Sequence, residues 1–304
     1  MLTANGTPIA APVSRFTVMK RTICRSAYVR KTRKKNKDGE SRPEIRDSML
    51  ITYKNVSLGY DGQAVVRNLD FTIEHGDYIW VVGENGSGKT TLIKGILRLL
   101  NPLEGRIVFC NELKQGRIGY LSQQMALKKD FPAGVLEIVL SGNLGGMGLR
   151  PFYNAKEKKL AEEAAERLGI TGLKKLCFRE LSGGQQRRVL LARALCAALT
   201  EPVSAGAEHR AVETSCRLLI LDEPAASLDP LVTAEVYELL KKLNRELGIT
   251  IIMVSHDTQA AEQYANRILH IEGGELVFFG ETADYLRSEK GKLFFTHNRE
   301  ENNA

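Results

Sequence analysis

The sequence predicts an α/β fold with a mostly parallel core sheet, and three observations support this. Short apolar segments alternate along the chain with longer segments of helical periodicity, an order typical of parallel sheets with helical crossovers. Apolar residues make up 43% and charged residues 26% of the 304 residues, as in ordinary globular domains. No stretch approaches about 18 consecutive apolar residues, so we expect no membrane-spanning segment.

Two antiparallel hairpins are predicted in addition to this core. Leu50–Leu58 and Val65–Ile73 are rich in β-forming residues, and the turn pair Asp61-Gly62 lies between them. Ile268–Ile271 and Leu276–Phe279 form a second, closing hairpin around two glycines. The first hairpin is expected to form a small antiparallel β subdomain.

The segments between the hairpins supply the core strands and the helices. The strands are expected over Tyr78–Val82, Arg117–Ser122, Leu218–Leu221 and Gly248–Ser255. The helices are expected over Lys89–Leu100, Ala133–Ser141, Asn154–Leu168, Ser182–Leu199 and Leu231–Leu247. Asn154 and Glu157 read as a capping box, and Pro230 takes the first position of the last helix. Segment 125–180 is expected to add a helical subdomain, and residues 200–217 a polar surface-loop insertion.

The basic character of the chain belongs to residues 1–48. The net charge is +7, but residues 1–48 alone carry 12 Lys or Arg against 4 Asp or Glu, so residues 49–304 are near neutral. A segment with so few large apolar residues cannot bury enough surface to offset its ordering entropy, and we expect a disordered extension. Three alternatives remain open: an upstream start codon with Met49 as the true beginning, attraction to anionic lipid headgroups, and an organelle transit peptide.

The five cysteines are scattered along the chain. They are Cys24, Cys110, Cys177, Cys196 and Cys216. Because they form no C-x-x-C pair, the sequence indicates neither a disulfide framework nor a zinc site. We therefore expect reduced thiols, as in a cytosolic protein.

A phosphate-binding loop is predicted between the strand Tyr78–Val82 and the helix that follows it. Its residues match the pattern G-x-x-x-x-G-K-[ST], and they are Gly83, Glu84, Asn85, Gly86, Ser87, Gly88, Lys89 and Thr90. Backbone N–H groups of such a turn can close around the phosphates of ATP, because no Cβ blocks the approach. Lys89 would reach the β- and γ-phosphates, and the Thr90 hydroxyl would bind Mg²⁺.

Polar side chains are also predicted at the carboxyl ends of core strands, where ligands bind in open α/β sheets. Asp222 and Glu223 follow the strand Leu218–Leu221. Asp222 would hold Mg²⁺ through water, and Glu223 would take the proton from the attacking water or orient it; a solvated acidic turn is the alternative. His256 is expected to contact the γ-phosphate. Gln123 could reach Mg²⁺ and the water.

The segment Leu181–Gln185 has two compatible interpretations. Ser182 and Gln185 form a capping box that opens a helix. A capped helix start with two glycines, Gly183 and Gly184, is also an anion site. We expect this site to act in trans, so that in a head-to-tail dimer each subunit closes on the γ-phosphate bound by the other.

Two further residues have weaker signals. Tyr60 lies 23 residues before the phosphate loop and could stack on adenine, although alone it reads as a hairpin aromatic. Asp229 precedes Pro230 and is at least a helix N-cap. It could also face the partner subunit.

Taken together, these residues resemble the nucleotide-binding subunit of ATP-binding cassette (ABC) transporters, over about residues 49–288. The resemblance identifies Tyr60 as the adenine-stacking aromatic and Gly83–Thr91 as Walker A, which adds Thr91 to the nucleotide site. It identifies Gln123 as the Q-loop glutamine that senses the membrane subunit, Leu181–Gln185 as the signature and Leu218–Asp222 as Walker B. It also identifies Glu223 as the catalytic glutamate, Ser227–Asp229 as the D-loop and His256 as the switch histidine.

The resemblance implies a P-loop NTPase cassette with an α-helical signature subdomain, and an ATPase that uses ATP and Mg²⁺. It implies a second ABC ATPase subunit, integral membrane permease subunits and an extracytoplasmic substrate-binding protein as partners, with no nucleic acid. The location implied is the cytoplasmic face of the cell membrane. Residues 289–304 remain as a C-terminal tail, with no room for a regulatory domain.

A finer resemblance, to zinc- and manganese-type importers, lies in Asp130–Gly142 and Ile251–Asp257 and implies uptake of a metal ion. Ser122 departs from the proline usual in such importers. The alternatives are the ATPase of an exporter or of lipoprotein release, and a soluble ABC ATPase acting on DNA or ribosomes. A non-catalytic cassette is disfavoured because Lys89 and Glu223 are both present.

Overall fold

The computed structural model describes residues 48–110, 113, 118–123, 132–147, 150–200, 216–225 and 228–302. The predicted extension, most of the 200–217 insertion and Ser227 therefore lie outside the described residues, as does the start of the segment after Gln123. Those predictions stay predictions.

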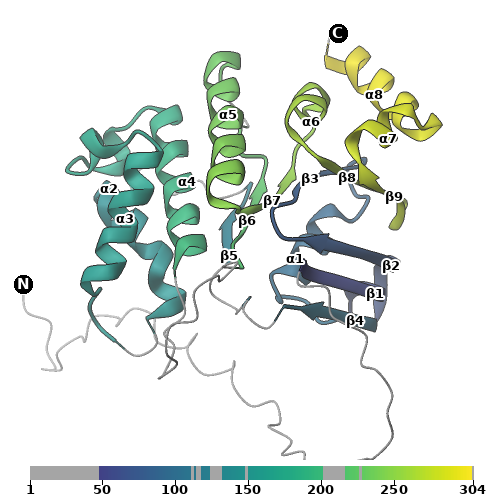
Figure 1. Cartoon of the computed structure of the whole chain (residues 1–304), viewed down its shortest axis with the longest axis horizontal. Coiled ribbons are helices and arrows are strands. Elements are labelled where there is room, and N and C mark those ends of the chain that lie inside the picture. The colour runs from purple at the N-terminus through teal and green to yellow at the C-terminus, as the bar shows by residue number, and fades with distance from the viewer. Residues whose placement is uncertain are drawn as a thin grey trace, which may run out of the picture. The chain divides into compact units, whose positions relative to one another are not determined.

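One nine-stranded sheet organises the described residues (Figure 1). Its strands are β1 (Met49–Tyr60), β2 (Gln63–Glu74), β3 (Tyr78–Val82), β4 (Glu104–Phe109), β5 (Ile118–Leu121), β6 (Leu218–Asp222), β7 (Thr250–Val254), β8 (Arg267–Glu272) and β9 (Glu275–Glu281). Their order is β4-β1-β2-β9-β8-β3-β7-β6-β5. The run β8-β3-β7-β6-β5 is parallel throughout, and β1 is antiparallel to β2 and β4. The predicted parallel core and antiparallel β subdomain are both confirmed.

Eight α-helices accompany this sheet in the described part of the chain. They are α1 (Lys89–Ile96), α2 (Val135–Leu140), α3 (Ala155–Arg167), α4 (Gly183–Leu199), α5 (Pro230–Leu247), α6 (Thr258–Tyr264), α7 (Thr282–Arg287) and α8 (Glu289–Asn302). Helices α2, α3 and α4 lie together beside β5, at one end of the sheet (Figure 1). This group is the predicted helical subdomain.

The parallel strands are buried on both faces, which is why they read as continuous apolar runs. In β3, Tyr78, Trp80 and Val82 enter the core shared with α3 to α6, whereas Ile79 and Val81 enter the core shared with α1 and the antiparallel strands. Trp80 is fully buried, and its indole N–H donates to the backbone oxygen of Ser255 at 3.1 Å. The strand that leads to the phosphate loop is thereby fixed to the end of β7.

The predicted helix starts are confirmed by their caps. Asn154 and Ser182 each accept a hydrogen bond from the backbone N–H three residues later, and Asp229 caps α5 in the same way. The first helix is shorter than expected, because it ends at Ile96 and Arg98 adopts a left-handed φ of 58°. The N–H of the next residue then bonds the carbonyl of Lys94 at 2.9 Å, a Schellman-type stop that overrides the apolar residues beyond it.

The C-terminal segment differs from the expected tail. Residues 289–302 form α8, and Phe295 is only 4% exposed. Its ring centroid lies 5.8 Å from that of Tyr285, a fully buried residue of α7. The apolar pair at Phe294 and Phe295 packs on the hydrophobic core, so the structured region extends past residue 288.

Candidate nucleotide site

The phosphate loop joins β3 to α1 and depends on glycine at two positions. Gly83 has φ 144° and Gly88 has φ 107°, values that residues with a Cβ rarely adopt. A Cβ on Gly83 would lie 2.1 Å from the backbone oxygen of Ile271, and one on Gly88 would lie 2.2 Å from a methyl of Val66. The neighbouring residues therefore fit closely around the loop. At Gly83 and Gly88 there is no room for a side chain.

The polar groups of this loop are arranged as an anion cradle. Lys89 folds back over the loop, and its Nζ donates to the carbonyl oxygens of Gly83 at 2.6 Å and Glu84 at 2.8 Å. The Ser87 hydroxyl is buried and has no hydrogen-bond partner within the described structure. No side chain caps the first turn of α1, so its N–H groups remain available to a ligand.

Two carboxylates follow at the end of β6. Asp222 is 9% exposed, and burial raises its pKa, an effect opposed by a backbone hydrogen bond from Gln123 and by the charge of Lys89. Burial likewise raises the pKa of Glu223, and the neighbouring Asp222 raises it further. Burial lowers the pKa of Lys89, whereas both carboxylates raise it. The three groups thus share one partly desolvated site.

Glu223 is held in a strained backbone conformation beside a histidine. Its φ is 50°, in the left-handed region, and its N–H donates to the carbonyl of Val254 at 2.9 Å. Its Oε1 lies 3.8 Å from Nε2 of His256, whose side chain is about half exposed. The strand ends of β6 and β7 therefore bring the predicted glutamate and histidine together.

Arg187 is a site residue that the sequence analysis missed. It lies on α4, and its guanidinium donates to the backbone oxygens of Glu223 and Pro224. Burial lowers the pKa of Arg187, and the charges of Glu223 and Asp222 oppose this shift. No motif marks this arginine, but its position two residues after Gln185 places it on the first turns of the predicted helix.

The other predicted nucleotide contacts lie around the loop with different degrees of exposure. Thr90 is exposed and Thr91 is buried, one on each side of α1. Gln123 is exposed, and its backbone makes a hydrogen bond to Asp222. Tyr60 is 42% exposed and its hydroxyl accepts a hydrogen bond from Lys94 at 3.0 Å, which lowers the pKa of the tyrosine. Lys94 is thus a second residue that sequence reasoning did not single out.

The signature segment stands apart from the phosphate loop. Ser182 and Gln185 exchange the two hydrogen bonds of a capping box, at 3.0 and 3.4 Å. Among the described residues, no hydrogen bond or ion pair joins Leu181–Gln185 to the loop. Gly183 is exposed, so the start of α4 is accessible to solvent.

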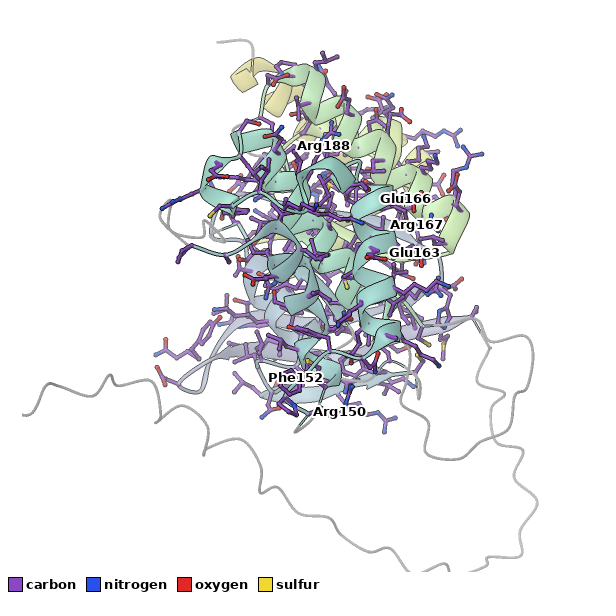
Figure 2. All side chains as sticks on the ribbon, turned by 90° about the vertical axis from the view of Figure 1, so that its left-hand side faces the viewer. Arg150, Phe152, Glu163, Glu166, Arg167 and Arg188 are labelled. Carbon is purple, nitrogen blue, oxygen red and sulfur yellow. The ribbon has the colours of Figure 1, made fainter. Side chains whose placement is uncertain are left out.

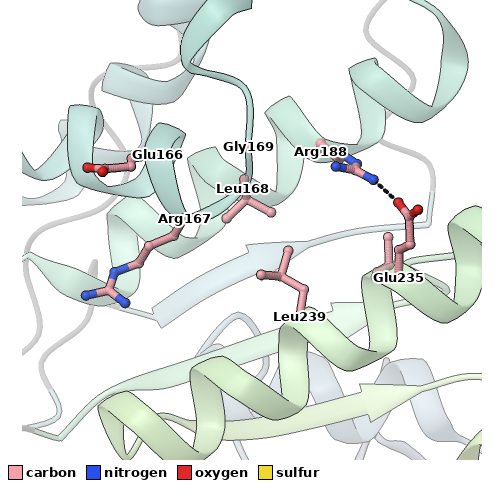
Figure 3. Close-up of a pocket in the computed structure, with 8 residues that line it drawn as sticks. Glu166, Arg167, Leu168, Gly169, Arg188, Glu235 and Leu239 are labelled. Carbon is pink, nitrogen blue, oxygen red and sulfur yellow. Dashed lines mark hydrogen bonds and ion pairs between the residues drawn. The ribbon is translucent and has the colours of Figure 1, made fainter.

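A hollow also lies between α3, α4 and α5, away from these groups (Figure 3). It has a volume of about 260 Å³, and Leu168 and Leu239 line it beside the ion pair of Arg188 and Glu235. It contains none of the predicted site residues. The chemistry of the loop and strand ends, rather than this cavity, therefore defines the candidate site.

No helix in the described residues combines the length and apolar character needed to span a bilayer.

The glycine loop, its lysine and the strand-end carboxylates define a P-loop ATPase. Residues 66–200 match the family model described as ABC transporter. Among curated proteins, the zinc uptake system ATP-binding protein ZurA of Listeria innocua is 35% identical over 242 residues, which cover 78% of this chain and 87% of ZurA. The phosphonates import ATP-binding protein PhnC of Staphylococcus saprophyticus is 38% identical over 250 residues, or 76% of this chain and 88% of PhnC.

Solved structures agree with this match. A protein assigned to the metal-chelate type of ABC transporter, in an inward-facing conformation, has a TM-score of 0.67 at 28% identity, covering 82% of this chain and 89% of its own. CbiO1 of Clostridium perfringens, part of the complex cbiONQ, has a TM-score of 0.64 at 26% identity over 80% and 93%. The dimeric cassette MJ0796 has 0.58 at 26% identity over 76% and 98%. The chain belongs to the ABC transporter family, and it is an ATP-binding, ATP-hydrolysing subunit.

Proposed function

We propose that Lys89, Asp222, Glu223 and His256 hydrolyse MgATP to drive uptake of a metal ion, zinc or manganese, through a partner permease. The observation that carries the hydrolytic part of this proposal is the partly buried Glu223, which follows Asp222 and lies 3.8 Å from His256 at the strand ends beside the phosphate loop. The carboxylates of a surface acidic turn would be solvated, whereas Glu223 is partly desolvated and lies near the charge of Lys89.

The residues at this edge fit a magnesium ion. Carboxylate, hydroxyl and amide oxygens are the ligands that Mg²⁺ prefers, and Asp222, Thr90 and Gln123 supply one of each. The raised pKa of Asp222 is what a carboxylate shows when it is buried without a full complement of positive charge. An ion held by these residues would supply charge neutralisation to the phosphates.

The roles of the remaining side chains follow from their positions. Lys89 lies over the loop, where its ammonium would pass from the loop carbonyls to phosphate oxygens. Glu223 would accept a proton from the attacking water at a carboxylate oxygen, and a raised pKa makes it a stronger base. His256 would orient Glu223 and donate to the γ-phosphate. Tyr60, steadied by Lys94, would stack on adenine.

The second half of the nucleotide site comes from another subunit in this proposal. Leu181–Gln185 makes no described bond to its own loop, and the exposed start of α4 offers free N–H groups to an anion. The relative MJ0796 is described as dimeric. A head-to-tail dimer would place each signature, with Ser182, Gly183, Gly184 and Gln185, on the ATP of its partner.

The membrane partner is proposed to dock on the helical subdomain. Leu144, in the 3-10 helix Ser141–Gly146, is 58% exposed and Phe152 is 81% exposed. Figure 2 shows Phe152 and Arg150 at the same end of this subdomain. Apolar surface exposed on one subdomain is available to a partner, and we propose that Leu144 and Phe152 contact a permease at the cytoplasmic face of the membrane. An extracytoplasmic binding protein would deliver the metal.

The cargo assignment is supported by the zinc uptake relative and by the finer resemblance to metal importers. Phosphonate import is the second candidate, because a phosphonate import relative has 38% identity against 35% for the zinc one. Neither the metal nor a phosphonate would touch this subunit. The permease and the binding protein would distinguish the two.

The proposal is tested in a strain of the source organism from which the gene for this chain has been deleted. The strain is complemented with the wild-type chain or with the Glu223→Gln variant. We expect zinc or manganese uptake to return with wild type only, while phosphonate uptake is the same in all strains. In vitro, Glu223→Gln should bind ATP and accumulate as a closed dimer, whereas Lys89→Ala should not bind. Normal ATP hydrolysis by Glu223→Gln would refute the assignment of the base, and restored phosphonate uptake alone would refute the cargo.

A further inference from the structure

Three potential metal ligands that are distant in sequence meet away from the nucleotide site. His75 follows β2, Cys110 follows β4 and Cys216 precedes β6. One ligand atom from each lies within 4.8 Å of the other two, and Cys216 Sγ is 3.7 Å from His75 Nε2. The cysteines form no C-x-x-C pair, so their spacing along the chain indicates no zinc site. The fold brings two of them together by another route.

The separations suit a tetrahedral zinc ion. Zinc–sulfur bonds of about 2.3 Å and zinc–nitrogen bonds of about 2.0–2.1 Å place S and N about 3.5 Å apart, and two S atoms about 3.8 Å apart. The Cys216–His75 separation of 3.7 Å is close to the first value. The remaining pairs, at no more than 4.8 Å, need only small side-chain rotations to reach tetrahedral spacing.

Two of the three ligand-bearing backbones, those of His75 and Cys110, are held by hydrogen bonds. The N–H of His75 donates to the carbonyl of Ser48, and that of Cys110 donates to Leu50, both at 2.9 Å and both at the start of β1. The turn after His75 is tied to the core, because the Gly76 N–H donates to the Thr250 hydroxyl at 2.9 Å. A metal would therefore meet a largely pre-arranged ligand set.

The ligand chemistry selects the ion. Two thiols and an imidazole are soft donors that favour zinc over magnesium or calcium, which take oxygen ligands. The cluster also lies at the amino end of β6, about 20 Å of extended chain from Asp222 at the other end. It is therefore distinct from the magnesium position of the ATP site.

We propose that His75, Cys110 and Cys216 form a zinc site that joins the antiparallel β subdomain to core strand β6. Three protein ligands leave the fourth tetrahedral position for water. Because Cys216 closes the predicted 200–217 insertion, the ion would also anchor the end of that insertion to the sheet. This site is independent of the cargo that the transporter carries.

The test uses the full-length chain, reduced, stripped of metal and free of nucleotide. Zinc is added, and the zinc retained after gel filtration is measured by mass spectrometry against a competing chelator. We expect one zinc per chain in wild type and in the control Cys177→Ser, whose cysteine lies outside the cluster. Loss of an outer-shell partner alone weakens metal binding by about 10–100-fold, so Cys110→Ser and Cys216→Ser should weaken it at least that much.

Cobalt substitution gives a second readout that a folding defect would not mimic. Wild type and Cys177→Ser should show thiolate-to-cobalt charge-transfer absorption, and each cluster variant should keep about half of it, because one of two thiolates remains. Basal ATP turnover should be unchanged in Cys216→Ser, which shows that the variant is folded. Wild-type zinc affinity in both cluster variants would overturn the proposal, as would a Cys110–Cys216 disulfide in a protein that binds no zinc after reduction.

Discussion

Arg187 is expected to hold Glu223 in its working position. Its guanidinium donates to two successive backbone oxygens, those of Glu223 and Pro224, from the first turns of α4. Glu223 has a φ of 50°, a conformation that costs a residue with a Cβ about 1–2 kcal/mol. Arg187→Ala removes both hydrogen bonds, so the turn is free to relax toward an unstrained backbone.

The expected size of the effect follows from these contacts. A hydrogen bond to a charged group contributes about 1.5–3 kcal/mol, but burial of the guanidinium, visible in its lowered pKa, offsets part of this. We therefore expect Arg187→Ala to lower the free energy of unfolding by about 2–3 kcal/mol. Release of about 1–2 kcal/mol of backbone strain would reduce the population with Glu223 in place by a factor of about 5–30. The kcat should fall by that factor.

Steady-state ATP hydrolysis separates this positioning role from a general loss of structure. The KM for ATP should change by less than about threefold, because Arg187 does not belong to the phosphate loop. Arg187→Lys keeps the charge but lacks the fork that reaches two carbonyls, so it should resemble the alanine variant. Arg188→Ala is the matched control, since the neighbouring arginine pairs with Glu235 instead. A normal kcat in Arg187→Ala would show that Glu223 needs no support from α4.

Glu223→Gln should raise the thermal unfolding midpoint of the nucleotide-free chain at neutral pH, because the raised pKa of Glu223 means that the folded state disfavours its ionised form. The increase in midpoint should disappear at acidic pH, where the wild-type carboxyl is protonated. An increase that is constant with pH would count against burial as its cause. Gly83→Ala should unfold at a much lower temperature than Gly86→Ala, since both glycines have positive φ but only a Cβ on Gly83 would lie 2.1 Å from a backbone oxygen. Equal unfolding midpoints would show that this steric clash does not determine stability. In urea titrations, Phe295→Ala should lower the free energy of unfolding by about 3–5 kcal/mol. Leu293→Ala, at a side chain that is 70% exposed, should lower it by less than about 0.5 kcal/mol. Similar losses in the two variants would mean that α8 does not pack as described.

The sequence predicts those parts of the fold whose signals are local. Parallel strands buried on both faces read as short apolar runs, and Asn154, Ser182 and Asp229 mark helix starts through bonds that reach only three residues. By contrast, β4 was not predicted, because its sequence has no clear alternation, most of its residues are exposed, and among the described strands it pairs with β1 alone. Its strand conformation is set by that pairing, which no short window of sequence contains.

In the candidate site, too, the sequence predicts the residues whose positions follow from the strands and misses those placed by tertiary packing. Asp222, Glu223 and His256 could be placed together because the carboxyl ends of neighbouring parallel strands meet at one edge of a sheet. Arg187 reaches that edge from a helix, and the angle at which a helix packs on a sheet is a tertiary property. The His75, Cys110 and Cys216 cluster is still less accessible to sequence reasoning, because its members are brought together by three different strands.

The working end of β6 is a locally unstable element in an otherwise well-packed sheet. Glu223 combines a left-handed φ with a desolvated carboxylate next to Asp222, and each of these features disfavours the folded state. The adjacent contacts oppose them: Arg187 bonds the turn from one side, and Trp80 bonds the Ser255 carbonyl from the core. Because Arg187 belongs to the same helix as the signature, a movement of the helical subdomain would act directly on the backbone of Glu223. The contact that stabilises this turn is therefore also a physical link between the signature helix and the proposed base.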